Sequence, residues 1–453
     1  MVVCSTMKNS NDNNNEDNLV YGIRLSSVGS ATVTGNLVYE PNNMDLAMKV
    51  HYLRVVYFLD SQAIEGLIPF KLKEAIFAWL CYYYESCGRF RRSEEDGRPF
   101  IKCNDCGVRF VEAKSSKTLD EWIQMEDTSS HRLLVADNVL GPELTFSPLV
   151  FLQITSFKCG GLSLGLSWAH VLGDAFSAAN YMNTLALFLN GLKPKFSPNL
   201  NKAPPPQNLK PKNPINSEPS TLKIVGSLGN HWIMPLPCEM GTISLHLKPT
   251  QLTQLQAKFS ENDSTLSPIQ SFEMLSAVIW RAIARIKDGP EPNIVTIIKK
   301  DAASPIEDVM ALRNNQFVGS VKADFSVGKA HPKVLAALIQ DKAKSERDQI
   351  EEVVGQDPGG CDCIIYGSNL TFVNLEEVDF YGFELKGLRP RFVNCFVDGV
   401  GGEGVVLVLP SPKDINGKSN AKTLSGGRIA TIILPKIYMM ELKKELKEWG
   451  LSA

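Results

Sequence analysis

Apolar residues along this chain recur in two patterns, short continuous runs and positions spaced three or four residues apart. Short apolar runs are typical of buried strands, and they occupy residues 52–58, 149–155, 162–168, 294–298, 368–373, 404–409 and 428–434. Helical spacing predicts amphipathic helices over residues 71–87, 268–285, 332–350 and 437–449. Predicted helices and strands alternate in both halves of the chain, which indicates the α/β class.

A proline-rich segment divides the chain near its middle. Residues 191–220 contain eight prolines and almost no apolar periodicity, so this segment is predicted to be an extended linker over the surface. A chain of 453 residues also exceeds the size at which a single hydrophobic core stops growing. We therefore predict a disordered N-terminal tail at 1–18, an N-terminal lobe at 19–192, a crossover linker at 193–222 and a C-terminal lobe at 223–453.

Charge and composition exclude several classes of protein. Lys plus Arg number 47 and Asp plus Glu number 49, so the chain has no basic field for nucleic acid. The N-terminal stretch Lys8–Asn18 is polar throughout, and it has no apolar region typical of a signal peptide. No uninterrupted apolar run is long enough to span a bilayer. We expect a protein that stays on the cytosolic side.

The ten cysteines predict neither disulfides nor a metal centre. In a cytosolic chain they are expected to be free thiols or small buried apolar residues. Cys103 and Cys106 have the spacing of half a zinc site, but no second pair follows at a suitable distance, and Cys361 and Cys363 form only a CxC pair. We predict no metal and no bound cofactor.

The chemically informative stretch is residues 162–189, where a predicted strand leads into a turn with His170 and Asp174 precedes a helix. A histidine with a pKa near neutrality suits a general base that takes a proton from an attacking hydroxyl or amine. Asp174 can cap the helix that follows and hold the shape of the turn. The alternative interpretation is a half-buried histidine beside an N-cap aspartate, with no catalytic role.

An HxxxD motif at the end of the first half, a proline-rich crossover and a second α/β half resemble the BAHD acyltransferases over nearly the whole chain. The resemblance implies two similar lobes of the chloramphenicol-acetyltransferase type that meet around a central channel. It also implies that His170 is the general base, reached by acyl-CoA from one face and by the acceptor from the other. Asp174 would then shape the histidine turn without touching substrate.

The chain departs from the family pattern at three places. Ala175 follows the motif where the family usually has glycine. The family's DFGWG signature is not intact in either register, residues 379–383 or residues 384–388. The arginine that pairs with the aspartate of that signature is also missing, because the strand at 294–298 leads into Lys299–Ala302. Both partners of one ion pair are therefore altered together, which avoids a single unpaired charge.

With these departures, the sequence resembles the eceriferum/glossy branch of the superfamily. The segments at 24–35, 44–58, 140–162 and 368–381 resemble the same branch. That branch consists of plant cuticular-wax factors that help a β-ketoacyl-CoA synthase at the endoplasmic reticulum extend very-long-chain acyl-CoA. The resemblance implies an accessory role in elongation, with this synthase and acyl-CoA as partners. The alternative is a CoA-dependent acyltransferase that moves an acyl group to an alcohol or amine with His170 as base.

Overall fold

The computed structural model describes residues 18–125, 128–194, 218–235, 238–260, 269–302, 311–357, 359–412 and 426–451. Nearly all of the predicted tail at 1–18 and most of the predicted linker at 193–222 lie outside these ranges. The division of the chain at the linker therefore stays a prediction. No helix in the described ranges combines the length and the apolar character needed to cross a membrane.

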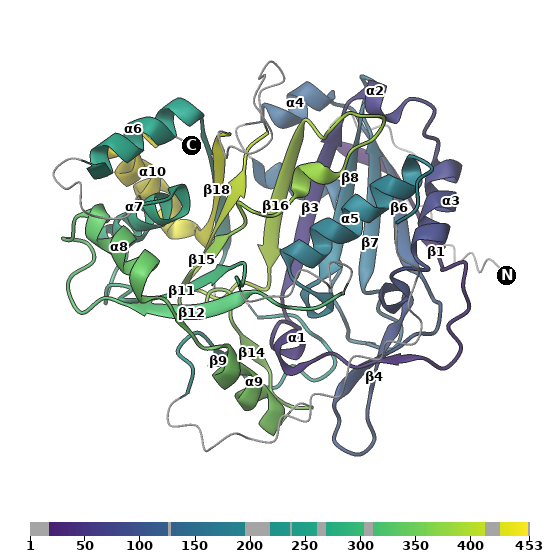
Figure 1. The fold of residues 1–453 in the computed structure, drawn as a ribbon, viewed down its shortest axis with the longest axis horizontal. Helices are drawn as coiled ribbons and strands as arrows, with labels where there is room; N and C mark the ends of the chain where they lie inside the picture. Colours follow the sequence, from purple (N-terminus) through teal and green to yellow (C-terminus); the bar gives the residue numbers. More distant parts are fainter. Residues whose placement is uncertain are drawn as a thin grey trace.

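Two mixed sheets stand side by side and form the centre of the molecule (Figure 1), which confirms the α/β class. The first sheet has the order β1-β6-β7-β8-β3-β16. Its strands are, in that order, Val20–Val28, Val108–Ser115, Val150–Ser156, Leu162–Ala169, Tyr52–Leu59 and Phe392–Asp398. The second sheet has the order β10-β18-β17-β15-β11-β12-β13. Its strands are Met240–Leu247, Arg428–Pro435, Val405–Pro410, Leu370–Asn374, Ile294–Lys299, Phe317–Lys322 and Lys344–Ser345.

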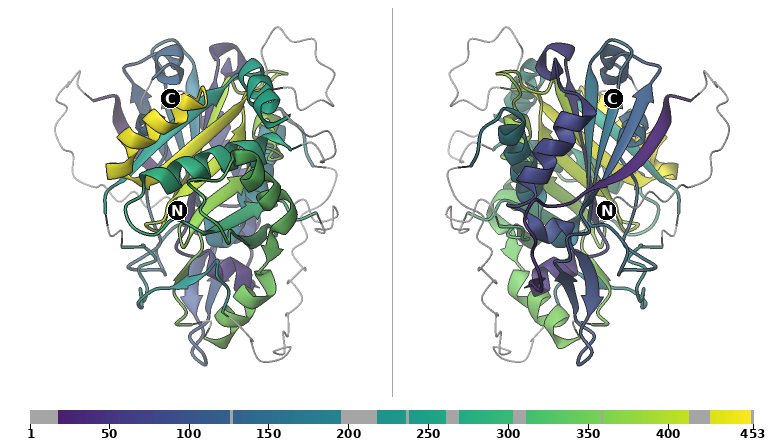
Figure 2. Two further views of the ribbon diagram at one scale, coloured as in Figure 1. Left: turned by 90° about the vertical axis from the view of Figure 1, so that its left-hand side faces the viewer. Right: turned by 90° about the vertical axis from the view of Figure 1, so that its right-hand side faces the viewer.

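Helices cover these sheets on opposite sides of the molecule. Helix α5 crosses the front of the first sheet and packs against α3 (Figure 1). Helices α7 and α10 lie on the face of the second sheet that points away from the first half (Figure 2). The helices of the first half are α1 Asn43–Ala47, α2 Ser61–Ile64, α3 Pro69–Trp79, α4 Leu119–Ile123 and α5 Ala175–Leu189. Those of the second half are α6 Pro249–Ser260, α7 Ser271–Ile286, α8 Pro332–Lys342, α9 Arg347–Gln356 and α10 Met439–Glu448.

Smaller elements complete the fold around the two sheets. A three-stranded sheet has the order β2-β5-β4, and a two-stranded sheet joins β14 to β9. These strands are β2 Val38–Tyr39, β4 Arg89–Arg92, β5 Pro99–Lys102, β9 Lys223–Ile224 and β14 Cys363–Ile364. The 3-10 helices are η1 Tyr84–Cys87, η2 Thr128–Leu134, η3 His170–Leu172, η5 Phe380–Gly382 and η6 Lys436–Tyr438.

Strand β17 shows why some strands are apolar at nearly every position. Val405 and Leu407 belong to a core shared with the first half, whereas Val406 and Val408 belong to a core under the helices of the second half. Successive side chains of a strand point to opposite faces. The second sheet therefore buries both faces, and its inner face forms the contact between the two halves.

Strand β16 comes from the second half of the chain but completes the first sheet. It pairs antiparallel with β3 along its whole length. Its last residue, Asp398, forms an ion pair with Arg54 of β3 at 2.8 Å and a second one with Arg132 of η2. The Asn394 amide lies 3.0 Å from Nδ1 of His131. One strand of the predicted C-terminal lobe is thus built into the sheet of the N-terminal lobe.

Two predicted helices end earlier than their periodicity indicates. The helix expected at 71–87 stops at Trp79 and is followed by η1. The helix expected at 332–350 is broken into α8 and α9 by β13, which pairs with β12 at the edge of the second sheet. Glu346 fixes this break, because its carboxylate accepts hydrogen bonds from Thr221 and from Ser320. These tertiary contacts override the local helical pattern.

Candidate functional site

The HxxxD segment folds in the order that the sequence predicts. Strand β8 ends at Ala169, η3 carries His170, and Asp174 is the N-cap of α5. Gly173 makes the tight turn between them with φ at 154°. A Cβ atom at this position would lie 2.9 Å from the backbone nitrogen of Arg313, so a larger residue would push the turn away from the second half.

Asp174 holds the turn and joins the two halves of the chain. One carboxylate oxygen accepts a hydrogen bond from the N–H of Ser177 at 3.0 Å, as an N-cap does. The other accepts from the N–H of Asn315, also at 3.0 Å. Burial raises the pKa of Asp174 above its ordinary value, and these two backbone donors oppose that rise. Its two oxygens therefore bond to backbone groups, and its role as a shaping residue remains a prediction.

His170 lies between the halves, and its ring and backbone together contact residues of both. Its Nε2 is 2.9 Å from the hydroxyl of Tyr366, and its backbone carbonyl accepts a hydrogen bond from the Asn314 side chain at 2.9 Å. Its N–H donates to the carbonyl of His51 at 3.0 Å. Tyr366 and Asn314 belong to the second half of the chain, whereas His51 belongs to the first. One half alone therefore does not enclose the ring.

The surroundings of His170 are dry and aromatic. His170 and His51 are each 0% exposed, and Tyr366 is 2% exposed. The His51 ring meets Tyr366 edge-on, with centroids 4.9 Å apart, and its Nε2 accepts a hydrogen bond from the N–H of Ile365. Burial lowers the pKa of His170 to about 4, because the charged imidazolium loses its hydration. The same cause, together with the neighbouring His170, lowers the pKa of His51 to about 3.

The buried carboxylate of Asp45 holds Asn314, one of the residues that contact His170. Asp45 of α1 accepts hydrogen bonds from both the backbone N–H and the side-chain amide of Asn314, at 2.8 and 3.0 Å. It also closes a capping box with Asn42 at the start of α1. Burial raises its pKa to about 6, and the Asn314 hydrogen bonds oppose that rise. Asp45 thus orients the amide that binds the His170 carbonyl.

This arrangement leaves Nε2 of His170 hydrogen-bonded in the conformation observed. If the Tyr366 hydroxyl donates to Nε2, the lone pair is already used; if Nε2 carries the proton, it has no lone pair to offer. The other ring nitrogen, Nδ1, is buried and has no hydrogen-bond partner among the described residues. The rings of His170, His51 and Tyr366 are all fully or nearly fully buried, so solvent does not reach Nε2 in this conformation.

A cavity of about 420 Å³ lies elsewhere, at the other end of β8. Its lining includes Leu162, the first residue of this strand, together with Ser61, Ile64 and Leu72. A strand rises about 3.3 Å per residue. Since β8 has eight residues, this cavity and His170 are separated by roughly 25 Å, and the cavity does not serve the HxxxD motif.

The altered signature segment is held by contacts other than the family's ion pair. The carbonyl of Asp379 accepts a hydrogen bond from the Asn183 amide of α5 at 2.9 Å. No ion pair between the Asp379 carboxylate and a basic side chain occurs within the described ranges. Close to it, Glu376 and Arg428 form an ion pair in which both side chains are less than a tenth exposed. This pair connects the segment that follows β15 to the start of β18.

Sequence reasoning identified His170 and Asp174 but missed the residues that surround them. Tyr366 and Asn314 are separated from His170 by 196 and 144 positions, and neither belongs to a motif. His51 follows directly on α1 and precedes β3, but no spacing relates it to the HxxxD motif. Across the described ranges, no three His, Cys, Asp or Glu side chains gather into a group that could hold a metal.

Comparison with known proteins establishes the family. The profile described as Transferase family matches residues 42–361, which is more than half of the chain. The chain belongs to this family. Its BAHD membership and its resemblance to the eceriferum branch are confirmed by two Arabidopsis thaliana proteins, ECERIFERUM 26 and ECERIFERUM 2. Each is 38% identical to this chain. The alignment with ECERIFERUM 26 covers 96% of this chain and 97% of that protein. The alignment with ECERIFERUM 2 covers 95% of this chain and 99% of that protein.

Solved structures of distant relatives show the same fold. Vinorine synthase superposes with a TM-score of 0.68 at 16% identity, over 95% of this chain and 98% of that one. TRI101 of F. graminearum, in a complex with coenzyme A and deoxynivalenol, superposes with a TM-score of 0.66 at 15% identity, over 91% and 98%. The two-lobed architecture of the CoA-dependent acyltransferases is therefore confirmed for this chain.

Proposed function

We propose that this chain is an accessory factor of very-long-chain fatty acid elongation for plant cuticular wax. In this role it acts with a β-ketoacyl-CoA synthase on acyl-CoA, at the cytosolic side of the endoplasmic reticulum. One observation carries the proposal: Nε2 of His170 is hydrogen-bonded to Tyr366 inside a cluster that solvent does not reach. The similarity to the two ECERIFERUM proteins supports the same role.

The electrostatics of the site favour a structural role for His170 over a catalytic one. A general base works best when its pKa lies near the operating pH. Burial lowers the pKa of His170 to about 4, so at neutral pH the ring is a weak acceptor for the proton of an alcohol. His170 then serves as part of the contact between the halves, through Tyr366 and Asn314.

The second candidate is an active acyltransferase, which the retained HxxxD geometry favours. In this role Asp174, which accepts hydrogen bonds from Ser177 and Asn315, would shape the turn, and His170 would become the base once Tyr366 turned away from Nε2. A tobacco shikimate O-hydroxycinnamoyltransferase is 26% identical to this chain, and the alignment covers 84% of this chain. This alternative requires the buried cluster to open, because the base must reach the proton that it removes.

The deciding experiment is His170→Ala in yeast that co-expresses this chain with a plant condensing enzyme. The accessory role does not use a base at this position, so we expect the extended acyl chains to persist at matched protein levels. An acyltransferase would lose on the order of a hundredfold or more in rate, the usual contribution of general-base catalysis. Acyl-chain profiles from gas chromatography measure the outcome.

The matched control is His231→Ala, the same substitution at an exposed histidine. Thermal unfolding of both purified variants separates a loss of folded protein from a loss of function. Elongation that disappears in a folded His170→Ala protein, but not in His231→Ala, would overturn the accessory role.

A further inference from the structure

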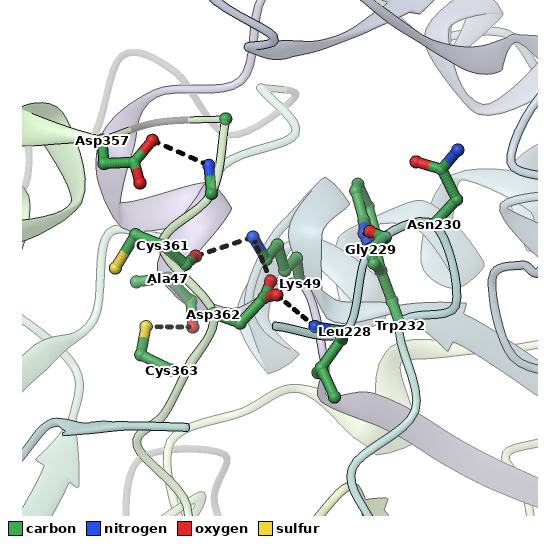
Figure 3. Close-up of polar contacts among 12 residues, drawn as sticks. Ala47, Lys49, Leu228, Gly229, Asn230, Trp232, Asp357, Cys361, Asp362 and Cys363 are labelled. Carbon is green, nitrogen blue, oxygen red and sulfur yellow. Dashed lines mark hydrogen bonds and ion pairs between the residues drawn. The ribbon is translucent and has the colours of Figure 1, made fainter. Parts of the chain in front are cut away.

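The segment from Cys361 to Tyr366 connects α9 to β15 and carries two thiols on one side. Cys361 and Cys363 point to the same side, and Asp362 points to the other, as Figure 3 shows. This alternation is the ordinary consequence of an extended backbone, in which residues i and i+2 share a face. The two sulfur atoms therefore lie on the same face of the segment.

The Asp362 side of this segment is held by an ion pair. Nζ of Lys49 lies 2.7 Å from the Asp362 carboxylate, and the two side chains are 1% and 4% exposed. The same ammonium donates to the carbonyl of Cys361 at 2.7 Å, and it lies 5.7 Å from the centre of the Trp232 ring. The other carboxylate oxygen of Asp362 accepts a hydrogen bond from the N–H of Leu228 at 2.6 Å. A positive charge is thus fixed beside the backbone of the two cysteines.

The thiol side combines an accessible sulfur with a buried one. Cys361 is half-buried and Cys363 is buried. The neighbouring Cys363 thiol and the Lys49 ammonium lower the pKa of Cys361 below its ordinary value. The neighbouring Cys361 thiol and burial raise the pKa of Cys363, whose thiol donates to the carbonyl of Ala47 at 3.8 Å. The thiolate is the reactive form of cysteine. Cys361, the more accessible of the two thiols, is therefore also the stronger candidate for the nucleophile.

We propose that Cys361 and Cys363 form a redox-active dithiol, a modification site at which a low-molecular-weight disulfide such as oxidised glutathione is reduced. The Cys361 thiolate attacks one glutathione sulfur, forms a mixed disulfide and displaces one glutathione thiolate, which takes a proton. The Cys363 thiol then loses its proton and attacks the Cys361 sulfur, and the second glutathione leaves as a thiol. Two protein thiols become one disulfide, and one glutathione disulfide becomes two thiols.

Closing this disulfide must alter the local backbone. In an extended strand the Cα atoms of residues i and i+2 are about 6.6 Å apart, which is near the upper limit of about 6.8 Å for a disulfide. Most disulfides have a shorter separation of about 5.5–6 Å, so we expect the segment to shorten on oxidation, although Cys363 is paired with Ile224 between β14 and β9. We expect this two-stranded pairing to weaken in the oxidised form. A disulfide under such strain is easily reduced again, and this site does not depend on the proposed function.

The test treats the full-length protein with oxidised glutathione, unfolds it in acid, alkylates the remaining thiols and maps the peptides by mass spectrometry. We expect Cys361 and Cys363 to be joined, so that the protein has lost two alkylatable thiols from this peptide. The exposed Cys159 and Cys238 are internal controls, and they should be free or carry glutathione. Reduced dithiothreitol should restore both thiols.

The variant Cys363→Ser separates the two steps. Without the second thiol, Cys361 should accumulate as a stable mixed disulfide with glutathione, whereas Cys361→Ser should show no modification of this peptide. Hydrogen exchange at Lys223–Ile224 should rise only in the oxidised wild-type protein. Wild-type protein in which Cys361 keeps glutathione while Cys363 stays reduced, or in which both remain free, would overturn the proposal.

Discussion

Two buried clusters lie at opposite ends of the segment from Cys361 to Tyr366, and burial affects them differently. At one end, Lys49 meets the carboxylate of Asp362 at 2.7 Å. At the other, Nε2 of His170 meets the hydroxyl of Tyr366 at 2.9 Å. Water is excluded from both clusters, but only the first combines opposite charges.

The difference shows what a buried ionisable group requires. A charge that is removed from water is tolerated when an opposite charge and further hydrogen bonds replace its hydration. Lys49 and Asp362 satisfy this requirement, and they also bind the carbonyl of Cys361 and the N–H of Leu228. His170 has no such partner, so burial lowers its pKa to about 4. One contact between the halves is therefore electrostatic, and the other depends on neutral packing and one hydrogen bond.

The largest predicted effect comes from breaking the charged contact. Lys49→Met leaves Asp362 buried with no compensating ammonium, and we expect the free energy of unfolding to fall by about 3–5 kcal/mol. Urea denaturation followed by circular dichroism measures this change. The control is Lys444→Met, which removes a partner from the exposed pair with Glu441 and should cost less than about 1 kcal/mol. Equal losses in the two variants would contradict the comparison.

A smaller effect concerns how the cluster around His170 makes stability depend on pH. The unfolded chain binds a proton at His170 below pH 6.5, whereas the folded protein does so only below about 4. Between these values the unfolded state binds more protons, so stability falls as the pH falls. We expect the His170 contribution to cost about 2 kcal/mol by pH 5.

The measurement compares wild type with His170→Asn at pH 7.5 and pH 5. Asp45 acts in the opposite direction, because burial raises its pKa to about 6, and the comparison cancels this shared contribution. Wild-type stability should fall more than that of the variant. A parallel change in both proteins would show that His170 is protonated in the folded state at pH 5.

The smallest predicted effect tests the hydrogen bond between His170 and Tyr366. Tyr366→Phe removes the partner of His170 Nε2, and we expect a loss of about 1 kcal/mol. Tyr57→Phe is a matched control, because the Tyr57 hydroxyl is buried without a hydrogen-bond partner in the described structure. Its removal should be neutral or slightly stabilising. A larger loss from Tyr57→Phe than from Tyr366→Phe would contradict this assignment.

Tyr366→Phe also sharpens the functional question. The variant is assayed for release of CoA from a long-chain acyl-CoA in the presence of small alcohols. The accessory role predicts no release above the wild-type background, because burial keeps the ring a weak base. Release that appears with Tyr366→Phe, and that disappears when His170→Ala is added, would show that the hydroxyl only masks a working acyltransferase.

Local signals in the sequence were sufficient for the element types and for the HxxxD turn. The period of apolar residues depends only on backbone geometry, and it predicted the ends of β3, β7 and β8 to within one residue. Asp174 was correctly expected before a helix, because an N-cap acts over three residues. The resemblance to the eceriferum branch likewise rested on contiguous segments.

Tertiary structure alone decided what lies against those elements. The break between α8 and α9 depends on Glu346 and an edge strand, and the place of β16 depends on pairing with β3 across the molecule. Tyr366 reaches His170 over 196 positions, and Lys49 reaches Asp362 over more than 300. No local pattern encodes these pairs, because they form only when segments that are far apart in the sequence pack against each other. The sequence therefore determined that His170 follows a strand and Asp174 begins a helix, whereas packing between the halves decided that the imidazole is neutral, enclosed and already hydrogen-bonded.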